Sequence, residues 1–556
     1  MRAATPLCCL TLIVAACCSA AAAVPQWGVF EAAAESGRMY QNPLLDAEVT
    51  VEFTSPGGKA TTVRAFWDYG PNWKARFQPD VTGRWTYRWR SSDAADESLS
   101  SVRGEFECVP FTGDNPLHRH GAVHVAPTGR YFAHADGSPF FWLGDTAWNG
   151  ALLASPDEWE TYLSDRAAKR FSVVQFVMTQ WRSATGDEDG RPPFIVRRGK
   201  IEVDPVFFQR MDERVDAINR HGLLAAPVLF WANGGHPEMN PGLFLSEEQL
   251  VAMGRYMVAR YGAHHVAWIL AGDGHYEGER IEIWKRVGRT LFGAAAPAIP
   301  RPATMHAVGR YWCGPFATED WFSFQGYQSG HRRLEGLADI VRGAPATEWQ
   351  GDPKRPVMNI EPCYEAHRNR APNAKPDDVF DDADVRRAAW LSLLSAPTAG
   401  LTYGAHGIWG WHPRPVEPMT HPGTGVGPAW YDAIHLPGSG QLAHMAEFFA
   451  GFEWWKLRPA QDLLRTQPGE DNLERWVAAA RTDDGKEIVI YTGGGDPIEL
   501  DPNLAGGIKP GSAWVSPRSG EQLRVTPPSA PGGASAVVRF VPPNDKDWVL
   551  WLRFRQ

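Results

Sequence analysis

PFFWLGDTAW, residues 139–148, has the pattern expected for the first strand of a parallel barrel. Its apolar run from Phe140 to Leu143 breaks at Gly144 and is followed by Asp145 and Trp148. A buried strand that ends in polar residues is typical of the point where a barrel strand reaches the reaction site. Seven further apolar runs follow this one along the chain.

These runs alternate with segments that carry helix signals. Ser155 caps one predicted helix, Asp204 and Pro205 begin the next, and Ser246 with Gln249 forms a capping box on a third. Strands alternating with helices predict a (β/α)8 TIM barrel, an α/β fold, over residues 113–440. The eight predicted strands are residues 140–143, 172–178, 223–230, 266–270, 303–308, 321–325, 356–360 and 400–403.

Short alternating runs flank the barrel on both sides. Val49, Val51 and Phe53 alternate with polar residues, which predicts an N-terminal β-sandwich over residues 24–112. Residues 441–556 predict a bridging helix followed by a C-terminal β-sandwich, with a hairpin turn at Asp484.

The first 23 residues predict a signal peptide. Arg2 precedes an apolar segment from Leu7 to Ala16 that is too short to span a membrane permanently, and small residues follow it. We therefore expect an exported protein, periplasmic or extracellular. Soluble export is favoured, and the alternative is a lipid anchor on Cys17.

Composition narrows the class of ligand. The formal net charge is −9 and basic residues are scattered, which argues against nucleic acid as a partner. The 25 tryptophans offer flat surfaces for sugars, although packing explains many of them. An HxH pattern at His118 lies ahead of the first barrel strand, and no CxxC spacing occurs, so we predict no metal and no cofactor.

Polar and aromatic residues just past each strand should face the reaction site. Two of the carboxyls among them, Asp273 after strand four and Glu361 after strand seven, lie where the ends of their strands face each other across a barrel. Two facing carboxyls suit glycoside cleavage, with a separation of about 5 to 5.5 Å for retention. In the alternative interpretation Asp273 caps a helix and Glu361 pairs with an arginine such as Arg182.

Other strand-end residues receive binding roles as hypotheses. We predict that Asp145, Asn233 and His406 bind sugar hydroxyls, because carboxylates, amides and imidazoles supply paired donors and acceptors. Tyr327 is predicted to donate a hydrogen bond to Glu361. The aromatic floor of the site is predicted to include Trp181 and Trp409.

Four motifs carry a family resemblance. PFFWLGDTAW, WILAGDGHY, RPVMNIEPCYE and YGAHGIWGW, in this order, resemble the apiosidase-like glycoside hydrolases. WGVFEAA and the segment around FWDYGPNW resemble the sandwich that often precedes this barrel, and LLRTQ with WVSPRSGE resembles the domain called putative collagen-binding.

The resemblance implies that Asp273 is the proton donor and Glu361 the nucleophile. The wider clan mostly has Asn-Glu after strand four, whereas this chain has Gly272 and the shorter Asp273. We expect apolar neighbours such as Trp268 to raise the pKa of Asp273, so that it stays protonated.

The predicted function is a secreted glycoside hydrolase that cleaves glycosidic bonds in oligosaccharides or polysaccharides of plant or bacterial origin. We expect it to act with retention, through a carboxylate nucleophile and a carboxylic acid/base. The alternative is a non-catalytic glycan-binding protein on the same scaffold. No oligomeric state is predicted.

Overall fold

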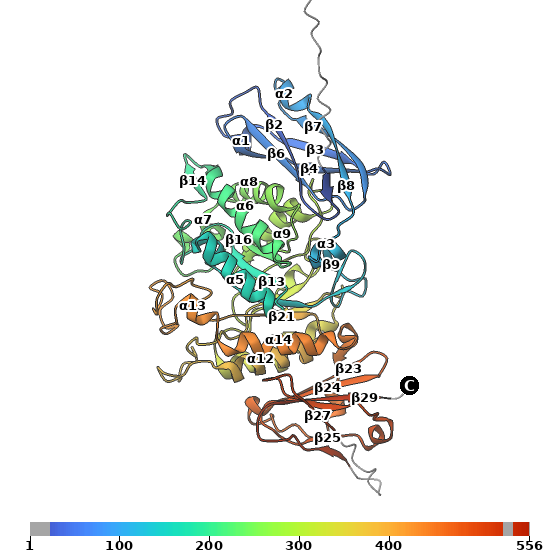
Figure 1. The fold of residues 1–556 in the computed structure, drawn as a ribbon. Coiled ribbons are helices and arrows are strands. Elements are labelled where there is room, and N and C mark those ends of the chain that lie inside the picture. Colours follow the sequence, from blue (N-terminus) through green and yellow to red (C-terminus); the bar gives the residue numbers. More distant parts are fainter. Residues whose placement is uncertain (1–22, 526–536, 555–556) are drawn as a thin grey trace, which may run out of the picture.

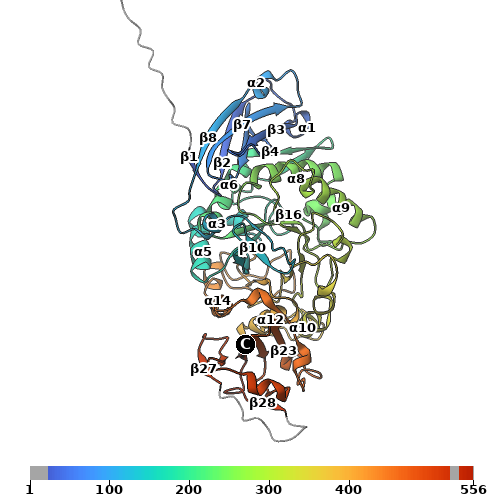
Figure 2. The same cartoon turned by 90° about the vertical axis from the view of Figure 1, so that its right-hand side faces the viewer.

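The computed structural model describes residues 23–525 and 537–554. The predicted signal segment, with Cys17, lies outside them except for Ala23, which is the first residue of strand β1. An N-terminal sandwich, a central barrel and a C-terminal sandwich follow one another along the long axis of the molecule (Figures 1 and 2).

The N-terminal sandwich consists of two antiparallel-rich sheets packed on an aromatic core. Alternate residues of β3 are buried, as predicted, and Phe53 stacks on Phe77 of the facing sheet with ring centroids 4.3 Å apart. One sheet has the order β1 (Ala23–Pro25), β8 (Arg103–Val109), β7 (Gly83–Ser91), β3 (Val49–Thr54) and β4 (Ala60–Arg64). The other has the order β2 (Phe30–Glu35), β6 (Asn72–Phe77) and β5 (Phe66–Tyr69), and the short helices are α1 (Pro43–Asp46) and α2 (Glu97–Ser100).

A charged cluster joins this sandwich to the barrel. Arg76 on β6 donates to both carboxylate oxygens of Asp212, at 3.0 and 2.7 Å, and Arg260 donates to the same oxygens at 2.7 and 2.6 Å. Arg260 also lies 2.8 Å from Asp68 of β5. The buried guanidinium groups of Arg76 and Arg260 therefore bind the carboxylate of Asp212 in the barrel, and Arg260 also binds that of Asp68 in the sandwich.

The barrel is a parallel sheet of eight strands within the described residues, and the predicted TIM barrel is confirmed. In chain order its strands are β12 (Trp142–Thr146), β13 (Val173–Val177), β16 (Leu224–Trp231), β17 (Trp268–Gly272), β18 (Ala303–Thr304), β19 (Gln325–Tyr327), β20 (Val357–Asn359) and β21 (Gly400–Tyr403). Between β18 and β19 the ring is closed by single hydrogen bonds, such as the 2.7 Å bond from Ser323 N to the Ala303 oxygen.

The first barrel strand begins later than the sequence predicts. Pro139 and Phe140 form a separate short strand, β11, in a small antiparallel sheet with β10 (Phe132–His134) and β9 (Val123–Val125). Strand β12 then runs through Thr146, and Asp145 is paired in register with Val174 and Tyr403. Asp145 is thus part of the strand and does not follow it.

The capping signals are confirmed at the major helices. Ser155 and Ser246 both form complete capping boxes, with Glu158 and Gln249 respectively, and Asp204 caps the helix that begins at Pro205. The barrel region contains α3 (Pro116–His120), α4 (Gly150–Leu153), α5 (Pro156–Ala168), α6 (Pro205–Arg220), α7 (Pro241–Phe244), α8 (Glu247–Tyr261), α9 (Glu279–Phe292), α10 (Arg333–Arg342), α11 (Ala344–Thr347), α12 (Asp382–Ser395), α13 (Trp430–Ala433), α14 (Pro437–Ala450) and the hairpin β14 (Phe194–Arg197) and β15 (Lys200–Val203).

The C-terminal sandwich packs against helix α12, and α14 lies beside it (Figure 1). The hairpin predicted at Asp484 joins β23 (Val477–Thr482) to β24 (Glu487–Thr492), with Gly485 at a φ of 68°. The main sheet has the order β22 (Leu457–Pro459), β23, β24, β29 (Trp548–Arg553), β26 (Ala513–Val515) and β27 (Gln522–Arg524), and β25 (Ile498–Leu500) pairs with β28 (Val538–Phe540).

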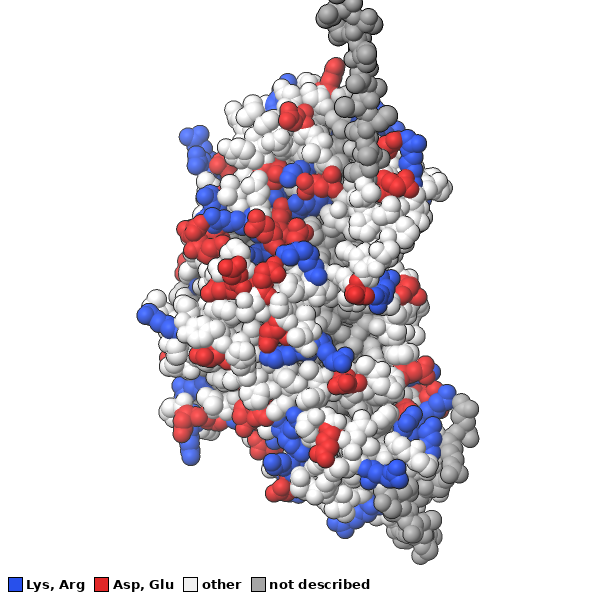
Figure 3. Space-filling model, in the orientation of Figure 1, with Lys and Arg blue, Asp and Glu red and all other residues white. Residues whose placement is uncertain are grey.

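Acidic and basic side chains are interspersed over the face of the molecule shown in Figure 3. Among the helices of the described residues, none is long and apolar enough to cross a membrane.

Candidate active site

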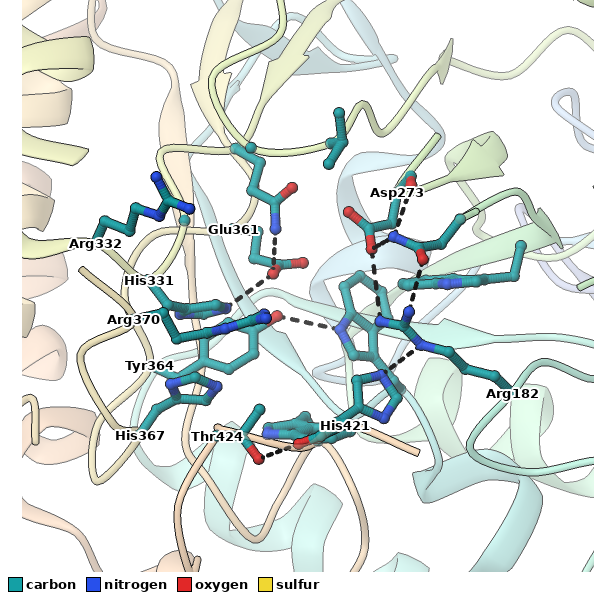
Figure 4. Close-up of a pocket in the computed structure, with 18 of the residues that line it drawn as sticks. Arg182, Asp273, His331, Arg332, Glu361, Tyr364, His367, Arg370, His421 and Thr424 are labelled. Carbon is teal, nitrogen blue, oxygen red and sulfur yellow. Dashed lines mark hydrogen bonds and ion pairs between the residues drawn. The ribbon is translucent and has the colours of Figure 1, made fainter. Parts of the chain in front are cut away.

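A cavity of 480 Å³ brings together residues that follow several barrel strands. Both predicted catalytic carboxyls, Asp273 after β17 and Glu361 after β20, line it (Figure 4). Trp181, Asn233 and Trp409 line it as well. A pocket of this volume, with aromatic walls and a few convergent polar groups, is typical of a small-ligand site.

Glu361 lies in a basic and amide-rich environment. One carboxylate oxygen accepts hydrogen bonds from Gln328 and from His331 Nε2, the latter at 3.1 Å. The other oxygen is 3.1 Å from His306 Nε2. Burial by itself raises the pKa of Glu361, but the hydrogen bonds from the two histidines outweigh it and hold the pKa well below its usual range.

Asp273 has the opposite shift. Burial, and then the negative charge of Glu361, raise its pKa to about 6, although Asn233 donates to its carboxylate at 2.6 Å and Arg182 lies 3.9 Å away. The predicted rise is confirmed, but Trp268 is not its cause, because that ring stacks on Phe292 of α9 on the helix side.

The backbone at Asp273 is unusual for a residue with a side chain. Its φ is +50°, in the left-handed region that non-glycine residues seldom adopt. Such a conformation persists only where surrounding contacts hold it, and it is often found at functional sites. The turn follows directly from the end of β17 at Gly272.

His306 connects the two carboxyl residues. The backbone N–H of Asp273 donates to His306 Nδ1 at 3.3 Å, so the ring proton of a neutral His306 is on Nε2, which faces Glu361. His306 lies two residues after β18, the fifth barrel strand. Among the described residues, no three His, Cys, Asp or Glu side chains are grouped so as to hold a metal ion.

Four tryptophans form the aromatic wall: Trp148, Trp181, Trp231 and Trp409. Trp181 donates to Asn149 at 2.6 Å, and its ring centroid is 4.5 Å from that of Trp231. Many of the other tryptophans, including Trp142 and Trp390, are fully buried in the core. The high tryptophan content therefore reflects packing more than ligand contact.

Asp145 does not line the cavity, and this placement corrects the sequence prediction. Its side chain is 0% exposed, accepts from Tyr162 at 2.7 Å and pairs with Arg166, both on α5. Because Asp145 lies within β12, the alternation of side chains along a strand turns it toward the helix layer.

Tyr327 and His406 also lie outside the cavity lining. Tyr327 is the last residue of β19, and its buried hydroxyl lies near Ser392 of α12, so it does not donate to Glu361. His406 donates from Nε2 to the Gly425 oxygen at 2.8 Å and accepts from Trp409 Nε1 at 3.0 Å. His406 thus holds Trp409 in position from outside the cavity lining.

Several cavity residues escape sequence reasoning because they lie on loops, His331 on the short one between β19 and α10. His331, Arg370 and His421 are separated from the nearest strand by turns whose course the sequence does not define. The sequence does indicate that Arg182 lies near the site, because it directly follows the predicted site residue Trp181. Its guanidinium donates to Asn233 at 2.6 Å and to His421 at 2.8 Å, and it lies beside Asp273 rather than pairing with Glu361.

A parallel barrel with two carboxyls facing one cavity at the ends of its fourth and seventh strands defines the class of barrel glycosidases. The chain belongs to the apiosidase-like family: the model described as "Apiosidase-like, catalytic domain" matches residues 126–456, more than half of the sequence. It is therefore a glycosidase. A domain of unknown function, DUF5060, matches residues 23–92, and a "putative collagen-binding domain of a collagenase" matches residues 459–553.

Solved structures share the fold. A structure described as a glycoside hydrolase is 23% identical, with a TM-score of 0.67, and the match covers 80% of this chain and 98% of that one. A family 5 glycoside hydrolase from Bacteroides vulgatus is 23% identical over 80% and 95% of the two chains, with a TM-score of 0.66. A second protein from that organism, a putative glycoside hydrolase, is 16% identical over 96% and 100%, with a TM-score of 0.68. Curated proteins include no match.

Proposed function

We propose that this protein hydrolyses glycosidic bonds with retention, with Asp273 as the acid and base and Glu361 as the nucleophile. One observation carries the proposal: two carboxyls line the same cavity, and their pKa values are shifted in opposite directions. A site whose environment separates the pKa values of two carboxyls provides an acid and a base at the same pH.

In the first step, the protonated Asp273 donates to the leaving oxygen while the ionised Glu361 attacks the anomeric carbon. The glycosidic bond breaks, and a glycosyl ester with Glu361 forms. In the second step, the Asp273 carboxylate takes a proton from water, whose oxygen attacks the anomeric carbon and releases Glu361. Gln328, His331 and His306 orient the nucleophile.

The substrate is proposed to be an oligosaccharide or polysaccharide of plant or bacterial origin. Trp181 and Trp409 supply apolar faces on which a sugar ring packs, and Asn233 supplies an amide beside the acid. We propose that three residues outside the cavity lining do not bind the sugar and only hold neighbouring elements in place. These are Asp145, Tyr327 and His406.

The test compares the mature protein with Glu361→Ala on a panel of pectic, hemicellulosic and arabinose-containing glycans. Release of reducing sugar that is absent in the variant supports the proposal, and proton NMR of the first product gives the anomeric outcome. Glu277→Gln is the matched control, because this exposed carboxyl near strand four does not line the cavity. A first product of inverted configuration contradicts the proposed mechanism.

We also propose export, on the basis of the first 23 residues, with residues 24–112, 113–440 and 441–556 as the three domains of the mature chain. Mass spectrometry of the protein from a bacterial host would give the mature N-terminus. Cleavage after residues 21–23 supports soluble export, whereas a lipid lost in Cys17→Ser supports the anchored form. A retained Met1 contradicts both.

A further inference from the structure

The charge of the cavity wall is opposite to that of the chain. Four arginines line it, Arg182, Arg310, Arg332 and Arg370, against two carboxyls, Asp273 and Glu361. The whole chain has a formal net charge of −9. In the proposed resting state Asp273 is protonated, which leaves Glu361 as the single negative charge among these six groups.

The arginines of this wall lack the close carboxylate partner that Arg76 and Arg260 share in Asp212. Arg182 donates to neutral groups instead, at 2.6 Å to Asn233 and 2.8 Å to His421. Figure 4 draws no hydrogen bond or ion pair from Arg332 or Arg370, and among the described residues neither forms an ion pair with a carboxylate. Arg182 is half-buried, and its closest carboxylate oxygen, on Asp273, is 3.9 Å away. These guanidinium groups have unused hydrogen-bond donors.

Arg370 and Arg182 approach the cavity from opposite sides. In Figure 4, Arg370 extends from the side of His331 and Tyr364, and Arg182 from the side of Asp273. Burial, together with the positive charge of Arg370, lowers the pKa of Arg182, although Asp273 and Glu361 act against this shift. Two like charges that face each other across an open space are relieved by an anion between them.

We propose that the cavity binds an acidic sugar, whose carboxylate or sulfate group is held by Arg370 and Arg182, with Arg332 at the rim. This inference rests on the proposed glycosidase function and specifies its substrate class. Planar guanidinium groups match carboxylate and sulfate oxygens in pairs, and such charge-assisted bonds are about twice as strong as neutral ones.

The test measures binding, so that it does not depend on cleavage. D-galactose, D-galacturonate and D-galactose 6-sulfate share one ring and differ at C6, and the gluco series provides the same comparison. Calorimetry with Glu361→Ala is expected to give affinity for the acidic sugars about 10- to 100-fold above that for the neutral one. Preference for the uronate or for the sulfate identifies which anion the site takes.

Arg370→Gln is expected to remove most of this difference, and Arg370→Lys to keep part of it, because lysine keeps the charge but not the paired donors. Arg414→Gln is the matched control: Arg414 is exposed on the loop that leaves the barrel and does not line the cavity. The preference should also weaken as salt rises from 0.05 to about 0.5 M, in line with screening.

Equal affinity for acidic and neutral sugars, or a preference that survives Arg370→Gln, overturns the inference and leaves the glycosidase proposal intact. Arg370-dependent binding of acidic sugars by a protein that cleaves none of their glycosides supports the inference and counts against the proposed reaction. The two proposals can thus fail separately.

Discussion

Two clusters of charge in this molecule use the same residue types in different ways. At the junction of sandwich and barrel, Arg76 and Arg260 each donate two hydrogen bonds to Asp212, and Asp68 is a further partner of Arg260. In the cavity, the nearest carboxylate oxygen to Arg182 is 3.9 Å away. The first cluster pairs its guanidinium groups with carboxylates at hydrogen-bond distance, and the second leaves Arg182 without such a pair.

The difference shows how a fold separates structural charge from functional charge. A buried ion pair with all its hydrogen bonds formed adds little net stability, but loss of one partner is costly. Charged groups kept apart in a cavity are held there by the rest of the fold, and in our proposal the acidic substrate supplies the charge that makes their interactions favourable.

The largest effect is a loss of activity, expected from a substitution in the cavity. Glu361→Ala is expected to lower kcat by about 10⁴-fold or more, because it removes the proposed nucleophile. Melting temperature should change little by comparison. Sodium azide is expected to restore turnover of a substrate with a good leaving group, with a glycosyl azide of inverted configuration as the product.

Azide acts because the shortened side chain leaves room for a small anion beside the anomeric carbon. A variant that keeps more than a tenth of wild-type activity without azide would rule out Glu361 as the nucleophile. Turnover measured with Glu277→Gln gives the value expected for loss of an acidic side chain outside the cavity.

The second largest effect is a loss of stability, expected from a substitution at the junction of the N-terminal sandwich and the barrel. Asp212→Ala leaves Arg76 and Arg260 with too few carboxylate partners, and we expect the free energy of unfolding to fall by about 3–5 kcal/mol. Activity per folded molecule at low temperature should stay near the wild-type value. Glu105→Ala, which removes an exposed partner of Arg84, should leave the melting temperature nearly unchanged. Equal melting curves for the two variants would contradict the contrast between the clusters.

The sequence predicts the barrel and the two carboxyls well, for a physical reason. Buried parallel strands give apolar runs, and helix caps such as Ser155 and Ser246 mark where each helix begins. Asp273 and Glu361 each follow a strand closely, so an error of one or two residues in the strand boundary still leaves them at the barrel mouth.

Where the orientation of one side chain decides the outcome, the same reasoning fails. Asp145 was expected past the end of the first strand, but the strand extends through Thr146 and directs Asp145 toward Arg166. Tyr327 is likewise still within its strand. A boundary error of two residues changes which side chain faces the cavity, and loop residues such as Arg370 carry no periodic signal at all.

A third effect concerns stability and pH. The raised pKa of Asp273 means that the folded protein holds this proton up to about pH 6, whereas the unfolded chain releases it near 3.8. The carboxylate therefore makes wild-type stability fall as pH rises through this window. Asp273→Asn cannot ionise, and asparagine tolerates a φ of +50°. Its melting temperature relative to wild type should rise between pH 4 and pH 7, while its activity is lost.

Differential scanning fluorimetry at pH 4, 5, 6 and 7 checks this expectation, with Glu277→Asn as a control that should run parallel to the wild type. A melting-temperature difference that is constant with pH would show that Asp273 has an ordinary pKa in the folded protein. In that case it could not remain protonated as the proposed acid.

The smallest effect tests the hydrogen bond that holds the acid. Asn233 donates to the Asp273 carboxylate at 2.6 Å and so favours its ionised form, which lowers the pKa. Asn233→Ala is expected to reduce kcat/KM about 10-fold through poorer orientation of Asp273 and Arg182. At the same time, the basic limb of the kcat/KM profile, expected near pH 6 in the wild type, should move to higher pH. A residue that merely packs would lower the profile without moving this limb, and a limb that moves to lower pH would mean that Asn233 favours the protonated acid.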